Sequence, residues 1–329
     1  MTKYLYLIVS IVFLSCCGQK NATKSVHDNM ITTQSRVTSP IFDADSAYSY
    51  VAAQVAFGPR VPNSEAHEAC ASYLASELER HGAKLHVQEA VLTAYNGDQL
   101  RSKNIIGVFN PEAKRRILLF AHWDSRPYAD HDPDEANHYK PIDGADDGGS
   151  GVGVLLEIAR QIGGNDIDKG IDIIFFDAED YGPPTFVNDN IPDPWALGSQ
   201  FWAKNPHVPN YKAEYGILLD MVGSKGAVFH KEATSMRYAS RYVEKVWATA
   251  RDLGYGKFFI NANIGGITDD HQYVIAGRGI PCLDIINYDP KSKKGFGDYW
   301  HTVNDTMDII DKQTLKAVGQ TVLEVIYSD

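Results

Sequence analysis

Carboxylate and imidazole side chains follow several predicted strands of this 329-residue chain, close to where each strand ends. The clearest case is a run of four large apolar residues, 173–176, which Glu179 and Asp180 follow closely. Such a run is typical of a central parallel strand buried on both faces, and functional groups collect at the carboxyl ends of such strands. Two adjacent buried carboxylates need a cation or a proton to compensate their charge. We interpret the pair as one metal ligand and one proton-transfer group, with a solvated acidic turn as the alternative.

Five further motifs place the same residue types at predicted strand ends or in the loops that follow. They are His122-Trp123-Asp124, the glycine-rich tract 143–151 with Asp146 and Asp147, Asp220, Asp269-Asp270-His271, and Trp300-His301. Zinc binds carboxylate oxygen and imidazole nitrogen, and a catalytic zinc site usually has three protein ligands and one open position. The tract 143–151 could instead be an ordinary turn or a phosphate-binding loop. Its two acidic residues and the absence of a following Gly-Lys-Ser/Thr weigh against phosphate.

Alternating predicted strands and helices indicate a single α/β domain with a mainly parallel central sheet flanked by helices. The predicted strands are 85–94, 103–109, 116–122, 171–176, 216–220 and 282–286. The predicted helices are 45–57, 67–81, 150–162, 239–253 and 313–327. Residues 181–200, with four prolines and Trp195, predict a long loop beside the candidate site, and loops of that length are usually functional or disordered.

The amino terminus reads as a targeting segment followed by a tether. Lys3 precedes the apolar residues 4–14, and Cys16 and Cys17 follow. This pattern indicates a bacterial lipoprotein-type signal over 1–17, with either cysteine as the lipidated residue. Polar residues over 18–41 predict a flexible tether, which leaves 42–329 as the folded domain. We therefore expect an exported protein, periplasmic or anchored to a membrane as a lipoprotein.

The charge of the chain argues against one class of partner, and the positions of its two remaining cysteines indicate their redox state. The formal net charge is −11 and no Lys/Arg-rich tract is present, which argues against nucleic acid as a partner. Cys70 and Cys282 lie far apart in sequence among apolar neighbours. We predict two buried free thiols, although an exported protein could also form a disulfide.

The ordered set of candidate residues resembles the zinc aminopeptidase clan. Within that clan the chain is most similar to the animal-type (type II) glutaminyl cyclases, particularly those of bacteria. Three motifs carry this closer resemblance: Phe-Gly-Pro-Arg-Val-Pro at 57–62, Ile-Thr-Asp-Asp-His at 267–271 and Phe-Gly-Asp-Tyr-Trp-His-Thr at 296–302. The match extends from about residue 42 to the end of the chain.

The resemblance implies a zinc-aminopeptidase-like fold with one zinc ion per chain, held by Asp146, Asp180 and His301. The animal enzymes have Glu at the position of Asp180, so this ligand is one methylene shorter here. Because bacterial members look similar at this position, we retain Asp180 as a ligand.

The resemblance also implies roles around the metal. Glu179 would be the general acid/base, and Asp220 and Asp269 would form a hydrogen-bonded pair near the substrate. Two close carboxylates resist joint ionisation, so this pair would share a proton. The substrate pocket would be formed by Trp195, Thr268, Phe296 and Trp300.

The implied reaction closes an N-terminal glutamine into pyroglutamate and releases ammonia, the activity of a glutaminyl-peptide cyclotransferase. Its partners would be peptides and proteins with N-terminal Gln, and we expect a monomer that touches the membrane only through its lipid. The alternative is a two-zinc aminopeptidase that hydrolyses N-terminal residues. All five ligands that it needs are present: His122, Asp146, Asp180, Asp220 and His301. Trp300 directly before His301 and the motif at 267–271 favour the cyclase.

Overall fold

The computed structural model describes residues 39–187 and 191–328. The signal segment predicted over 1–17 and nearly all of the tether predicted over 18–41 lie outside the described residues. Within the described part of the chain, no helix is both long enough and apolar enough to cross a membrane.

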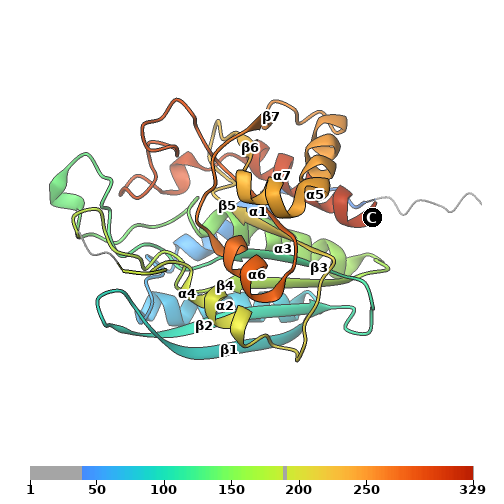
Figure 1. The fold of residues 1–329 in the computed structure, drawn as a ribbon, viewed down its shortest axis with the longest axis horizontal. Helices are drawn as coiled ribbons and strands as arrows, with labels where there is room; N and C mark the ends of the chain where they lie inside the picture. Colours follow the sequence, from blue (N-terminus) through green and yellow to red (C-terminus); the bar gives the residue numbers. More distant parts are fainter. Residues whose placement is uncertain (1–38, 188–190, 329) are drawn as a thin grey trace, which may run out of the picture. The chain divides into compact units, whose positions relative to one another are not determined.

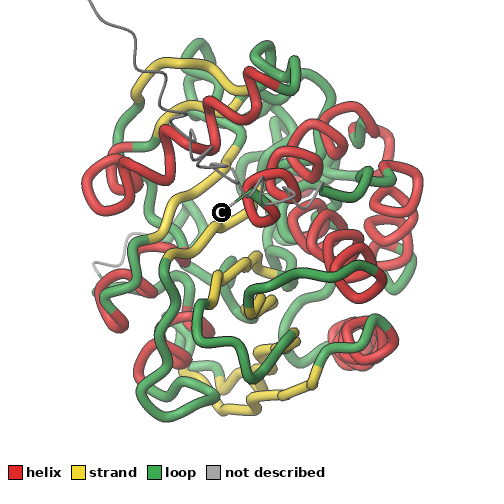
Figure 2. The backbone as a smooth tube through the Cα atoms, turned by 90° about the vertical axis from the view of Figure 1, so that its right-hand side faces the viewer, coloured by secondary structure: helices red, strands yellow, loops and turns green. Residues whose placement is uncertain are grey.

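A six-stranded sheet lies between helices on both of its faces (Figures 1 and 2). The helices are α1 Ala44–Val55, α2 Glu65–Arg80, α3 Gly149–Gly164, α4 Leu197–Lys204, α5 Ala233–Asp252, α6 Asp270–Arg278 and α7 Lys312–Tyr327, with short 3-10 turns η1 Glu135–Asn137 and η2 Met307–Ile309. The strands are β1 Lys84–Thr93, β2 Gln99–Phe109, β3 Arg116–His122, β4 Gly170–Phe176, β5 Tyr215–Asp220, β6 Phe229–Lys231, β7 Phe259–Asn263 and β8 Cys282–Ile286. β6 and β7 pair in parallel as a separate small sheet.

The main sheet has the strand order β1-β2-β4-β3-β5-β8. The four strands β4, β3, β5 and β8 run parallel, whereas β1 and β2 form an antiparallel hairpin at one edge and β2 is antiparallel to β4. In register, His122 pairs with Phe176 and Asp220 pairs with Ile286. The carboxyl ends of all four parallel strands therefore meet at one edge of the sheet, which is where ligands bind in open α/β sheets.

Alternation along the central strands supplies apolar side chains to both layers of helices. On β3, Ile117, Leu119 and Ala121 belong to the larger core, which includes residues of α1, α2, α3, α5 and α7. Leu118 and Phe120 face the smaller core, with residues of α4 and α6. Strands buried on both faces explain why the sequence of β4 is almost wholly apolar.

The predicted fold class is confirmed by this architecture, and the six strands of the main sheet all lie where the sequence placed them, within a few residues. Three features were missed: the short helices α4 and α6 and the small sheet. The predicted loop 181–200 ends earlier than expected because α4 begins at Leu197. The predicted free thiols are confirmed, since Cys70 and Cys282 are buried and unpaired.

Candidate active site

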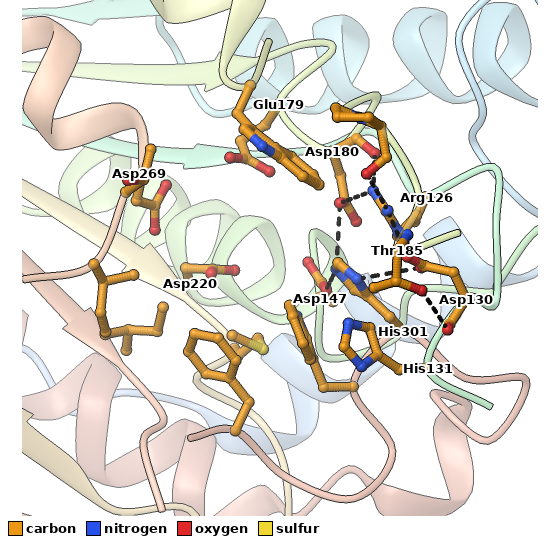
Figure 3. A pocket seen from close by; sticks show the side chains of 18 residues that line it. Arg126, Asp130, His131, Asp147, Glu179, Asp180, Thr185, Asp220, Asp269 and His301 are labelled. Atoms are coloured by element: carbon orange, nitrogen blue, oxygen red, sulfur yellow. Dashed lines mark hydrogen bonds and ion pairs between the residues drawn. The ribbon is translucent and has the colours of Figure 1, made fainter. Parts of the chain in front are cut away.

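One cavity at the carboxyl edge of the parallel strands collects nearly all of the predicted site residues (Figure 3). Nine of the ten line it: Glu179, Asp180, Trp195, Thr268, Asp220, Asp269, Phe296, Trp300 and His301. They come from the loop after β4, the end of β5, the segment before α6 and the long segment after β8. Asp146 is the exception, and its neighbour Asp147 lines the cavity instead.

Asp147, Asp180 and His301 form a buried group whose ligand atoms lie close enough to hold one metal ion. His301 Nε2 lies 3.3 Å from Asp180 Oδ1 and 3.5 Å from Asp147 Oδ2. Ligand atoms at the usual zinc distances of about 2.0–2.2 Å, arranged as a tetrahedron, stand about 3.4 Å apart. One buried oxygen on each carboxylate, Oδ2 of both Asp147 and Asp180, has no hydrogen-bond partner. The donor set and its spacing therefore fit zinc.

The prediction of Asp146 as a metal ligand is not supported by its position. Its Oδ1 accepts a hydrogen bond from the Gly223 amide at 2.7 Å, and its Oδ2 accepts one from the Tyr299 hydroxyl. Both carboxylate oxygens are thus used in binding the β5–β6 connection and the C-terminal segment. The sequence offers no signal to separate two adjacent aspartates, because the direction of each side chain depends on the local backbone.

The backbone around Asp147 is fixed by a second buried carboxylate. Asp305 accepts hydrogen bonds from the amides of Asp146 at 2.8 Å and Asp147 at 3.1 Å. Gly148 follows with φ +86°, and a Cβ at that position would lie 2.3 Å from the Asp124 carbonyl oxygen. Only glycine tolerates both the left-handed backbone and this close approach. The turn therefore directs Asp147 toward the cavity just before α3 begins.

A second group of possible ligands shares Asp147 with the first. His122 Nε2 lies 3.1 Å from Asp147 Oδ1 and 3.2 Å from Asp220 Oδ1, and all three residues are buried. This group contains two of the residues that the two-zinc alternative requires beyond the first site. Four of the five ligands predicted for the two-zinc enzyme, His122, Asp180, Asp220 and His301, thus lie around the carboxylate of Asp147, which takes the place of the predicted Asp146.

The turn that carries Glu179 and Asp180 is held by Asp124 from the His122-Trp123-Asp124 motif. Asp124 accepts hydrogen bonds from the Glu179 amide at 3.1 Å and the Asp180 amide at 3.2 Å. Ala178 precedes them with φ +54°, a conformation that is costly for alanine. This strained turn sends two consecutive side chains into the same cavity, with Asp180 toward the metal group and Glu179 beside it (Figure 3).

Glu179, Asp220 and Asp269 surround the side of the cavity away from His301 (Figure 3). Burial, and then the charges of Asp269 and Asp180, raise the pKa of Glu179 well above its ordinary value, against the opposing effect of His122. Burial also raises the pKa of Asp220 to about 6. For Asp269, burial and then the charges of Asp220 and Asp270 raise the pKa well above its ordinary range.

The hydrogen bond expected between Asp220 and Asp269 requires a proton on one of the two carboxyl groups, and it stays a prediction. Asp269 caps α6 through its own Oδ1, which accepts from the Asp270 amide at 2.6 Å, and its Oδ2 has no partner. The raised pKa values nevertheless agree with a pair of carboxyl groups that retains a proton. The free Oδ2 of Asp269 is available to a ligand in the cavity.

Aromatic rings form the wall of the cavity around the metal group. The Trp300 ring stacks on His301 with centroids 3.8 Å apart, and it lies 4.6 Å from Phe296 and 4.4 Å from His131. Trp195 lies across the guanidinium of Arg126, 4.9 Å from the ring centroid. An apolar wall with a few convergent polar groups is typical of a small-ligand site.

Buried acidic residues and a histidine also lie behind Asp269. His271 Nε2 lies 3.3 Å from Glu232 Oε2, and His271 Nδ1 lies 3.9 Å from Asp284 Oδ2. Burial acts to raise the pKa of Glu232, but the contact with His271 and the amides of Ser235 and Thr234 lower it to about 2. Glu232 also caps α5 through these amides, so the group joins the start of α5 to the start of α6.

Arg126 and Asp130 are among the cavity residues that the sequence did not predict. Both follow the His122-Trp123-Asp124 motif in the loop after β3, and both line the cavity. A lone arginine and aspartate in a loop carry no spacing signal of their own. Their position within a loop at the carboxyl end of a central strand is the only indication that the sequence could have offered.

The comparisons with known proteins agree with this geometry. Residues 104–326 match Peptidase family M28, and the chain belongs to that family. A glutaminyl cyclase from Tannerella forsythia is 73% identical to this chain, with a TM-score of 0.87 over 88% of this chain and 100% of that one.

Two further proteins are also similar to this chain. A Zn-dependent exopeptidase from Parabacteroides distasonis is 70% identical, with a TM-score of 0.88 over 88% of this chain and 99% of that one. The glutaminyl-peptide cyclotransferase of Bos taurus is 26% identical over 282 residues, which are 78% of this chain and 74% of that protein. These matches confirm the resemblance to the animal-type cyclases and their bacterial relatives, and they confirm the fold class.

Proposed function

We propose that this protein is a zinc-dependent glutaminyl cyclase, which converts the N-terminal glutamine of peptides and proteins to pyroglutamate and releases ammonia. The single observation that carries the proposal is the content of one cavity. A metal-binding group, the half-buried Glu179 and the free Oδ2 of Asp269 face each other within aromatic walls. The glutaminyl cyclase from Tannerella forsythia, which is 73% identical to this chain, supports the proposal.

Asp147, Asp180 and His301 are the residues that would hold zinc, one ion per chain. When bound, zinc supplies a Lewis acid that polarises the γ-carbonyl of the glutamine and stabilises negative charge on its oxygen. With Asp147 in place of the predicted Asp146, the proposed ligands are still two aspartates and one histidine.

Glu179 has the position and the protonation behaviour of the general acid/base. The α-amine of the substrate forms a bond to the δ-carbon, which is the carbonyl carbon of the side-chain carboxamide, and the bond from that carbon to the amide nitrogen breaks. Glu179 accepts the proton that the amine loses and delivers it to the leaving nitrogen, so that ammonia departs. A raised pKa brings a carboxyl group closer to working pH, where it can both accept and donate a proton.

Asp269 and the aromatic walls would select and orient the substrate. The free Oδ2 of Asp269 can accept a hydrogen bond from the carboxamide nitrogen that leaves. Trp195, Phe296 and Trp300 suit the uncharged stem of glutamine and exclude water, which would otherwise compete with the amine. Thr268 is exposed and lines the cavity next to Asp269. The amine and the carbonyl belong to one substrate molecule. The aromatic wall therefore acts mainly by holding the glutamine in a conformation in which its amine lies next to its carbonyl carbon.

A two-zinc aminopeptidase is the second candidate, and the group of His122, Asp147 and Asp220 favours it. In that reaction a second ion would lie beside the first and near the amine of the substrate. The cyclase needs the same amine free as a nucleophile, so we propose that this second group stays without metal. A proton retained by Asp269, whose pKa burial raises well above its ordinary value, would reduce the negative charge of this part of the cavity instead.

Incubation of the purified protein with a Gln-initiated peptide separates the two reactions. A cyclase releases ammonia and leaves every residue in the peptide, which mass spectrometry detects as a loss of ammonia alone. Release of the first residue as a free amino acid would instead identify an aminopeptidase. A peptide beginning with Leu serves as the matched control, because only the aminopeptidase can act on it.

We further propose that the chain acts as a monomeric, exported lipoprotein. The sequence of residues 1–17 supports a lipoprotein signal, 18–41 a tether and 42–329 the catalytic domain. Metabolic labelling with a fatty acid, compared between wild type and a variant with Ser at both Cys16 and Cys17, tests the anchor.

A further inference from the structure

Arg126 is a fully buried arginine in the wall of the cavity, with 1% of its side chain exposed. Its Nε and Nη2 donate to both oxygens of Asp130, at 2.7 and 3.0 Å. Its Nη1 donates to the Asp180 main-chain oxygen at 3.0 Å and to Asp180 Oδ1 at 3.2 Å. The planar guanidinium therefore binds two carboxylates at once, and one of them belongs to the metal-binding group (Figure 3).

The same two residues hold the segment that forms one wall of the cavity. Arg126 Nη2 lies 3.4 Å from the Pro183 carbonyl oxygen, and the Trp195 ring covers the guanidinium. Asp130 Oδ2 accepts from the Thr185 amide at 2.8 Å, and the Asp130 carbonyl accepts from the Thr185 hydroxyl at 3.1 Å. Three points of the loop between β4 and α4 are thus fixed to Arg126 or Asp130.

Asp130 also approaches the second metal-binding side chain. Its Oδ1 lies 3.6 Å from His301 Nδ1, the ring nitrogen opposite the one that faces Asp147 and Asp180. The backbone supports this approach, because the His131 amide donates to the His301 carbonyl at 3.0 Å. This separation is too long for a hydrogen bond, but a carboxylate on this side of a metal-binding histidine favours the ring orientation in which Nδ1 faces it.

We propose that Arg126 and Asp130 are a positioning pair that couples the metal-binding group to the substrate wall. The pair contacts two of the three metal-binding residues and three points of the loop that carries Trp195. Binding of metal and binding of peptide then favour the same arrangement of these two residues, and by linkage each strengthens the other. The inference rests on the proposed zinc site and substrate. It adds that zinc binding and peptide binding are coupled through Arg126 and Asp130.

The short metal ligand gives the pair a physical purpose. Asp180 is an aspartate, whose side chain is one methylene shorter than that of glutamate, so its carboxylate reaches only a short distance from the backbone and must be placed by its surroundings. Arg126 binds the main-chain oxygen of this residue and Oδ1, the same carboxylate oxygen that lies 3.3 Å from His301 Nε2. Lysine could supply the charge but could not bind Asp180, Asp130 and Pro183 together or stack under Trp195.

The test compares Arg126→Lys with Arg116→Lys in the full chain. Arg116 forms the same kind of two-bond ion pair, with Asp172 at 2.7 Å for both contacts, but at the opposite end of β3. Zinc affinity is measured by competition with a chromophoric chelator, and KM and kcat are measured with a Gln-initiated peptide. For Arg126→Lys we expect about 10- to 100-fold weaker zinc binding, a KM raised about 10-fold and a smaller change in kcat at saturating zinc. Arg116→Lys should keep both wild-type values.

The coupling between zinc binding and peptide binding is measured by the same chelator competition. Zinc affinity is compared in the absence and in the presence of a saturating analogue of a Gln-initiated peptide that cannot cyclise. The analogue should tighten zinc binding in wild type and in Arg116→Lys but not in Arg126→Lys. Equal zinc affinity and KM in wild type and Arg126→Lys, or equal losses in Arg116→Lys, would overturn the proposal.

Two further measurements cover the cases in which Arg126→Lys does not fold or the wild type is inactive. If circular dichroism shows that Arg126→Lys does not fold, Asp130→Asn is tested in its place. We expect Asp130→Asn to bind zinc more weakly than wild type. Unchanged zinc binding in this variant would count against the proposed pair. If wild type releases no ammonia from the peptide, the proposed function fails, whereas zinc affinity still decides whether the pair supports the metal-binding group.

Discussion

Asp146 and Asp147 are adjacent in the chain, yet their carboxylates serve different parts of the protein. Asp147 Oδ2 lies 3.5 Å from His301 Nε2 in the cavity, whereas Asp146 Oδ1 accepts from the Gly223 amide at 2.7 Å. Asp305 fixes the backbone of both residues. One carboxylate is thus free to bind a cation, and the other connects loops.

This division predicts opposite effects for two conservative substitutions. Asp147→Asn should remove most of the zinc and lower kcat/KM by about 100-fold or more, since several kcal/mol of charge stabilisation depend on the metal. Asp146→Asn should keep the zinc but lower the free energy of unfolding by about 1–3 kcal/mol, because a buried hydrogen-bonding group is mismatched. Zinc content by atomic spectroscopy and urea denaturation measure the two effects. The reverse pattern would restore Asp146 as the ligand.

Glu179→Gln should abolish turnover while zinc stays bound. The amide cannot accept the amine proton, and loss of a general acid/base typically costs about 10²- to 10⁴-fold in rate. Zinc content and ammonia release are measured on the same preparation. Glu112→Gln, in an exposed turn, is the control and should keep the wild-type rate. A Glu179→Gln protein that has lost its zinc would show that this residue supports the metal instead.

Metal analysis should give one zinc per chain. The group of His122, Asp147 and Asp220 could hold a second ion, but the proposed reaction needs the substrate amine free. His122→Gln should therefore leave the count at one and keep the zinc affinity within a few fold of wild type. A wild-type count of two that falls to one in this variant would support the aminopeptidase.

Trp300→Ala should raise KM for a Gln peptide by about 10-fold or more. The Trp300 ring stacks on His301, contacts the tilted ring of Phe296 and forms part of the apolar wall, where a ligand can bury its own apolar surface. Trp300→Phe should restore part of the affinity. Trp247→Phe, on α5 in the larger core, should leave KM unchanged. Equal KM values in all four proteins would remove Trp300 from the substrate wall.

Stability should depend on the protonation of Glu232 in acid. Its pKa is about 2 in the folded protein against 4.5 ordinarily, so its ionised form stabilises the fold fully above 4.5, and this contribution is lost as the pH falls toward 2. Between about pH 5 and pH 3 the loss amounts to about 2 kcal/mol. The difference in the free energy of unfolding between wild type and Glu232→Gln should therefore decrease by this amount as the pH falls over the same range. Parallel curves for the two proteins would contradict the assignment.

The sequence determined the main sheet and most of the site because both depend on local patterns. Runs such as residues 170–176 can be stable only when buried on both faces, and parallel strands bring their carboxyl ends together. The residues that follow those strands, including Glu179, Asp180 and Asp220, were therefore predictable as a group. Short elements with weak patterns, such as α4 and β6, gave no comparable signal.

Only the tertiary structure decided which of two adjacent aspartates faces the cavity, and which residues hold the ligands in place. That choice depends on the Asp305 carboxylate, the left-handed turn at Gly148 and the contacts of Tyr299. The pairing of Arg126 with Asp130, Asp180 and Trp195 likewise joins segments whose spacing in the chain carries no regularity. Sequence patterns report which residues end a strand, whereas the direction of a side chain is set by partners that lie far away along the chain.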